Sequence, residues 1–114
     1  ALTLVRELGD RQGEGTLLNA LGMVALNSGD GAAAERHFDE GLKASREAGD
    51  KEGQVLLLFN LGSVVAARGD LPRAQSLLTE ALLLARQVGD QDAEKAIQER
   101  LKQIRDALGG GDAT

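Results

Sequence analysis

The dipeptide Gly-Asp recurs every twenty residues, and this spacing constrains the fold more than any other feature of the chain. Its copies stand at positions 9–10, 29–30, 49–50, 69–70 and 89–90. Residues 12–51 also align with residues 52–91 without a gap, so the underlying period is forty residues. Repetition on this scale is typical of a solenoid, whose units bury their apolar faces against one another. We therefore predict a linear stack of helical hairpins.

Each segment between two Gly-Asp pairs has apolar residues at helical spacing and is too long for a strand. We expect each glycine to adopt the left-handed conformation that ends a helix, and the following aspartate to cap the next helix. These roles fall on adjacent residues, so the turns are tight and the helices antiparallel. Pro72 lies in the first turn after Asp70, where its missing N–H costs nothing. Helices are predicted at residues 2–8, 11–28, 31–48, 51–68, 71–88 and 91–108.

Composition limits the function. The chain has 114 residues, enough for one domain with a linear core, and Phe38 and Phe59 are its only aromatic residues. A net charge of −5 disfavours nucleic acid as a partner. Cysteine is absent, which excludes disulfides and thiolate metal sites, and the longest apolar run, residues 55–59, is far short of the roughly 18 residues of a membrane span. We expect a cytoplasmic protein with no cofactor, metal or membrane partner.

The forty-residue unit resembles the tetratricopeptide repeat. Its first helix carries Leu-x-x-Leu-Gly, ending at Gly22 and Gly62, and its second helix carries small residues such as Ala34 and Ala74. The resemblance implies that the glycines let paired helices approach, while Phe38 and Leu78 fill the gap between them. A period of forty rather than thirty-four residues makes each helix about one turn longer. This variant is similar to the long arrays of kinesin light chains and of many bacterial regulators.

Other families of helical repeats also fit part of this pattern. An armadillo or HEAT array would also suit a forty-residue period, although the Leu-Gly and alanine signature favours the tetratricopeptide repeat. A pentatricopeptide RNA reader is opposed by the acidic balance of the chain. The predicted fold class is an all-α, right-handed α-solenoid of antiparallel helix hairpins.

The predicted domain comprises residues 1–108, with two full repeats at 11–50 and 51–90. Residues 91–108 are predicted to form a capping helix, because Gln98, Lys102 and Arg105 replace the apolar or small residues of the preceding repeat. Residues 109–114 are expected to form a flexible tail.

Residues 1–10 match only the end of a second helix and are predicted to form a partial helix. Part of the next helix, around Leu21 and Val24, would then lie uncovered. We expect the chain to be the C-terminal part of a longer array whose uncapped N-terminal face promotes self-association. The alternative is a stable monomer.

The resemblance also implies a concave groove lined by the first helices of successive units, which receives a peptide or partner helix. Register places Thr16, Leu26, Ala67, Ala96, Glu99 and Gln103 along it. The candidate binding residues are Asn19, Met23, Asn27, Leu56, Phe59, Asn60, Ser63 and Arg100. Met23, Leu56 and Phe59 are predicted to form an exposed apolar floor flanked by amides, suited to a partly apolar peptide or amphipathic helix. The alternatives are inter-helix packing for these three residues and a simple surface amide for Asn60.

Catalysis is disfavoured. His37 is the only histidine, stands beside the predicted core residue Phe38, and is expected to be partly buried as a packing residue. Turns this tight leave no loop to form a lid over a reaction centre. The predicted function is a non-catalytic protein–protein interaction scaffold that binds a protein or peptide segment. The alternative is a structural module that forms homo-oligomers.

Overall fold

The computed structural model describes residues 10–109, which form five α-helices and no strand. They are α2 (Arg11–Asn27), α3 (Gly31–Ala48), α4 (Lys51–Ala67), α5 (Leu71–Val88) and α6 (Gln91–Leu108). The predicted all-α fold is confirmed, and each of these helices begins at its predicted residue. The predicted helix at residues 2–8 and positions 110–114 of the predicted tail lie outside the described residues. Gly109, which was assigned to that tail, instead caps the end of α6.

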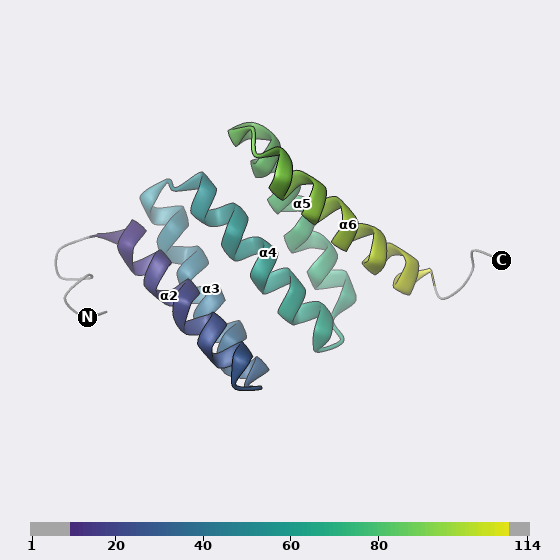
Figure 1. Ribbon diagram of the computed structural model, residues 1–114, viewed down its shortest axis with the longest axis horizontal. Helices are drawn as coiled ribbons and strands as arrows, with labels where there is room; N and C mark the ends of the chain where they lie inside the picture. Colours follow the sequence, from purple (N-terminus) through teal and green to yellow (C-terminus); the bar gives the residue numbers. More distant parts are fainter. Residues whose placement is uncertain (1–9, 110–114) are drawn as a thin grey trace.

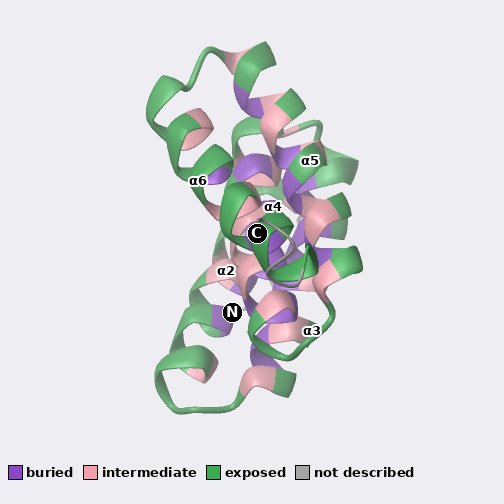
Figure 2. Ribbon diagram, turned by 90° about the vertical axis from the view of Figure 1, so that its right-hand side faces the viewer, coloured by how far each residue is buried: buried purple, intermediate pink, exposed green. Residues whose placement is uncertain are grey.

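The helices form two layers (Figure 1). Helices α2, α4 and α6 lie in front and constitute the first-helix layer, with α3 and α5 behind them as the second-helix layer; a view turned by 90° separates the two (Figure 2). Each helix packs against the next along the chain, α4 also touches α2 and α6, and α2 and α6 do not touch. The molecule measures 55 × 32 × 18 Å. It is therefore an elongated stack of hairpins without a single centre.

Aspartates in the turns serve two helices each. At Asp30, the backbone N–H donates to the carbonyl oxygen of Ala25 at 2.9 Å, and the carboxylate accepts from the N–H of Ala33 at 3.0 Å. The glycine before it, Gly29, has a φ of +83°. Glycine adopts this left-handed backbone conformation readily because it has no Cβ atom. The same arrangement recurs at the turns centred on Gly49, Gly69 and Gly89. The roles predicted for Gly-Asp are confirmed at these four turns, although α2 and α4 end one residue early, and Gly9 of the first pair lies outside the described residues.

Glycine in the first helix of each hairpin makes room for a large side chain from the second. A Cβ built at Gly22 would lie 2.4 Å from Cε1 of Phe38, and one built at Gly62 would lie 2.9 Å from Cγ of Leu78. Phe38 and Leu78 are both fully buried. The close approach that the family resemblance implied is therefore present in both hairpins.

A second close approach, between Gly15 on α2 and α3, was not anticipated from the sequence. A Cβ at Gly15 would lie 2.6 Å from the hydroxyl oxygen of Ser45 and 3.3 Å from the carbonyl oxygen of Gly41. Ser45 is buried here although it is polar. A serine on a predicted helix gives no signal that distinguishes burial from exposure, so only the packing shows its role.

Ion pairs join consecutive repeats on the second-helix side. Glu35 of α3 accepts hydrogen bonds from Arg68 at 2.7 Å and from Arg73 at 2.9 Å. Arg46 of α3 donates to both carboxylate oxygens of Glu80 on α5, at 2.9 and 2.8 Å. These pairs connect residues about one repeat apart and therefore favour the stacked arrangement, each by at most about 1 kcal/mol at such exposed sites.

The pKa of Glu35 should make stability depend on pH. The hydrogen bond from Arg73 is the main cause that lowers this pKa below its ordinary value; Arg68 adds to the effect and partial burial opposes it. A carboxyl group with a lowered pKa stabilises the fold above its unfolded pKa and loses that contribution as pH falls through its folded pKa. We expect Glu35→Gln to lower the free energy of unfolding at pH 7 by about 1 kcal/mol or less.

Urea unfolding at pH 7 and at about pH 3 measures this difference, which should shrink at the lower pH. Glu47→Gln is the control. The Glu47 carboxylate forms only a long ion pair, with its Oε2 atom 3.7 Å from Nε of Arg11, and its side chain is largely exposed. A difference that is constant across this pH range would contradict the assignment.

Candidate functional site

The outer face of the first-helix layer exposes large apolar side chains. Leu56 is 50% exposed and Met23 is 39% exposed, so both present apolar surface to solvent, and their binding role stays a prediction. Phe59 differs, because it is half-buried and packs against the core. The predicted exposed apolar floor therefore needs correction at Phe59, which contributes only part of its surface.

A pair of amide side chains bridges α2 and α4. Asn60 donates from Nδ2 to Oδ1 of Asn19 at 2.8 Å, and both residues are half-buried. Ala20 is the equivalent of Asn60 in the first unit, and the contact of Asn60 with Asn19 was not predicted from the sequence. Each amide has more donors and acceptors than one bond uses. The pair thus fixes the two helices and retains capacity to bind a peptide backbone.

Phe59 and Arg100 connect α4 to α6. The Arg100 guanidinium carbon lies 5.7 Å from the centre of the Phe59 ring, an arrangement worth about 0.5–1 kcal/mol at an exposed site. Ser63 lies one turn beyond Phe59 and donates its hydroxyl hydrogen to the Phe59 carbonyl at 2.8 Å. It therefore offers a partner an acceptor rather than a donor.

The remaining candidates, Met23 and Asn27, lie one and two turns beyond Asn19 on α2. Together with Leu26, which is 42% exposed, they form an apolar and uncharged end of this face. The structure thus brings together Asn19 with Asn60 and Phe59 with Arg100. Met23 and Asn27 belong to the same layer but extend it along α2.

Two crevices open between neighbouring helices of the first-helix layer. The first crevice, between α2 and α4, has a volume of about 60 Å³ and is lined in part by Gly15, Thr16, Asn19, Gly53 and Leu56. The second crevice, between α4 and α6, has a volume of about 220 Å³ and is lined in part by Glu52, Leu56, Phe59, Asp90, Ala93 and Ala96.

Sequence reasoning missed the contribution of Glu52 and Asp90 to the second crevice. Asp90 was interpreted only as a cap, and it does accept from the N–H of Ala93 at 3.0 Å. Both residues lie at or just before the first turn of their helices. The groove positions that the family resemblance implied begin one turn later, at Leu56 and Ala96. The signal that could have found Glu52 is its place one turn before Leu56, on the same helix face.

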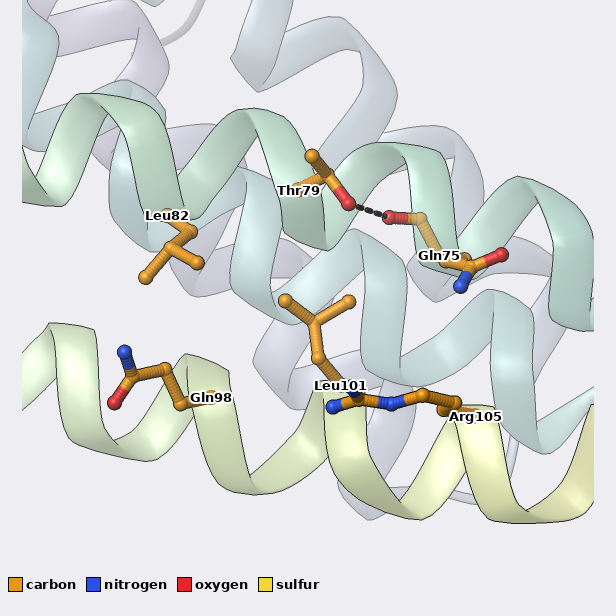
Figure 3. A pocket seen from close by; sticks show the side chains of 6 residues that line it. All are labelled: Gln75, Thr79, Leu82, Gln98, Leu101 and Arg105. Atoms are coloured by element: carbon orange, nitrogen blue, oxygen red, sulfur yellow. Dashed lines mark hydrogen bonds between the residues drawn. The ribbon is translucent and has the colours of Figure 1, made fainter.

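A third hollow lies on the other side of α6 (Figure 3). Its volume is about 350 Å³, and Leu82 of α5 and Leu101 of α6 point into it between polar side chains. Gln98, Lys102 and Arg105 are exposed along this side of α6. These exposures agree with a polar face, while the role of α6 as a cap stays a prediction.

Groups with catalytic chemistry are not concentrated on the first-helix face. His37 is half-buried on α3, and its Nδ1 is buried without a hydrogen-bond partner. Within residues 10–109, no three histidine, cysteine or acidic side chains gather in a way that could hold a metal ion. The same residues include no helix with the length and apolar character needed to cross a bilayer.

Stacked hairpins with glycine notches and a layer of exposed first helices define a helical-repeat protein. The family model described as tetratricopeptide repeat matches residues 13–87, more than half of the chain. The chain therefore belongs to the tetratricopeptide repeat family, whose repeats generally mediate protein–protein interaction. A comparison with curated proteins gives no match.

Proposed function

We propose that this protein is a non-catalytic scaffold that holds a peptide segment or amphipathic helix in a concave groove along α2, α4 and α6. The observation that carries the proposal is the exposure of Leu56 beside the Asn19–Asn60 amide pair. An apolar side chain at half exposure gains free energy when a ligand covers it, and the amides add hydrogen bonds to a peptide backbone. The family supplies the expectation of a protein partner.

The proposal also covers the repeat variant, the role of α6, the cellular location and the kinds of partner. We place the chain in the long-repeat variant that resembles kinesin light chain arrays, because its period is forty residues. In this proposal the protein acts in the cytoplasm, and α6 is the capping helix of its repeats. Neither nucleic acid nor membrane is a partner in this proposal, because the net charge is −5 and the first-helix face is mainly apolar and amide-bearing.

We test peptide binding in the groove with a phage-displayed library of random twelve-residue peptides, selected for binding to the immobilised protein. We expect selected peptides to bind at least about tenfold more weakly to a Phe59→Ala, Asn60→Ala double variant, a loss of about 1.4 kcal/mol. The control is Thr79→Ala, an exposed position on α5. Circular dichroism verifies that helix content is unchanged in each variant.

If the selected peptides bind the double variant as well as they bind the parent chain, the groove is not their site. That result, or a selection without any convergent sequence, would contradict the proposed function.

Self-association is the second candidate function, and the exposed side of α2 favours it. Val24 is 62% exposed and Leu21 is 37% exposed, whereas the residues one repeat later, Val64 and Leu61, are buried. Between Gly15 and Gly29 the chain carries no charged residue. Two copies could cover this stripe by placing α2 against α2 in a two-fold symmetric contact.

Sedimentation velocity across a range of concentrations tests this second function. The chain should form a dimer whose fraction rises with concentration, and Val24→Glu should shift it to the monomer by burying a charge in the contact. Leu83→Glu is the matched control, because Leu83 is 56% exposed on the opposite layer. A monomer at every concentration would remove this candidate.

A further inference from the structure

The two crevices of the first-helix layer are equivalent sites one repeat apart. Adding forty residues to the first crevice carries Thr16 to Leu56, Asn19 to Phe59, and Leu56 to Ala96. Because the backbone arrangement recurs, the two crevices differ mainly in their side chains. Differences in chemistry at equivalent positions show what each crevice can receive.

Leucine fills the first crevice, while alanine leaves the second one open. Leu56 stands in the first crevice where Ala96 stands in the second, and the volumes are about 60 and about 220 Å³. The smaller volume holds about two water molecules at roughly 30 Å³ each. The larger volume is below the range of about 300–1,000 Å³ that is usual for small-molecule sites. It has the size to accept one large side chain of a partner.

The walls of the second crevice are apolar along its length. Val55 and Ile97 form a buried floor, Phe59 and Ala93 are half-buried, and the polar wall of Thr16 and Asn19 has no counterpart here. A large apolar side chain would replace water against these walls, which is favourable in proportion to the apolar area covered.

Carboxylates close one end of the second crevice. Glu52 is exposed at its edge, and Asp90 lies there with one carboxylate oxygen bound to the N–H of Ala93. Asp50, the equivalent of Asp90, also lines the first crevice, so the two crevices differ in charge at Glu52, whose equivalent is the neutral Gln12. Lys51 precedes Glu52 on α4, and Arg100 lies over Phe59, one turn beyond Ala96. The N-terminal end of the crevice thus complements a positive charge beside the apolar anchor.

We propose that the second crevice recognises a peptide segment in which a large apolar side chain is adjacent to a lysine or arginine. The apolar side chain occupies the space over Leu56, Phe59 and Ala96, and the cation lies beside Glu52 and Asp90. This inference rests on the proposed peptide-binding function and assigns specificity within it. The first crevice is smaller, and its lining includes Leu56 and Leu57 as well as Thr16 and Asn19, so it adds only shallow contacts to the same segment.

Two substitutions test the assignment by giving the second crevice the residues of the first. Ala96→Leu copies Leu56 and should fill the crevice, and Glu52→Gln copies Gln12 and removes the negative charge. Ala96 and Glu52 are both exposed, so neither substitution replaces a buried side chain. The control for Ala96→Leu is Gln98→Leu, which places the same side chain at an exposed position on the other side of α6. The control for Glu52→Gln is Glu47→Gln on α3.

The probe is the set of twelve-residue peptides selected from the random phage-displayed library, resynthesised with a fluorescent label. We expect the selected sequences to combine Leu, Ile, Met, Phe or Trp with a neighbouring Lys or Arg. Fluorescence anisotropy should show affinity at least tenfold weaker for Ala96→Leu and about threefold weaker for Glu52→Gln. The affinity for Glu52→Gln should also depend less on salt than that of the parent chain.

Peptides that depend on Phe59 and Asn60 but bind the Ala96→Leu variant normally would overturn this inference while leaving the proposed function intact. Selected peptides that are acidic or uncharged would overturn the assignment of the cation. A selection without groove-dependent peptides would contradict the proposed function itself, and this inference with it.

Discussion

Glycine leaves space in the first helix of each hairpin for a large side chain from the partner helix. Gly22 receives Phe38 and Gly62 receives Leu78, and neither large side chain retains exposed surface. The second hairpin repeats this arrangement with Leu78 in place of Phe38. The two-layer arrangement, and with it the exposed face of α2, α4 and α6, depends on this contact.

Translational repetition also explains how a face can acquire specificity. The backbone presents equivalent positions at each period, so a crevice recurs between each pair of first helices. Several exchanges separate the two crevices, among them Leu56 to Ala96 and Asn19 to Phe59, and their volumes are about 60 and about 220 Å³. Function in such a scaffold resides in the departures from the repeat, while the repeated residues maintain the fold.

Much of the fold could be predicted because its determinants are local. Gly-Asp fixes each helix end through one left-handed residue and one cap, and the Leu-Gly motif fixes the notch. Details of the site could not be predicted as well, because they depend on contacts between different helices. The partner of Asn60 proved to be Asn19, and Phe59 proved to be half-buried. Both outcomes depend on how side chains of different helices pack together, which the sequence alone does not resolve.

The most direct test of the glycine notch is a double-mutant cycle on the free energy of unfolding, measured by urea denaturation. Gly22→Ala should cost about 1–3 kcal/mol, although alanine is the better helix former by about 1 kcal/mol, because the new Cβ meets the Phe38 ring. Phe38→Leu gives the first hairpin the smaller side chain found at Leu78. If the notch holds the hairpin together, the double variant should lose about 1 kcal/mol less than the sum of the single losses. Strictly additive losses would contradict the account.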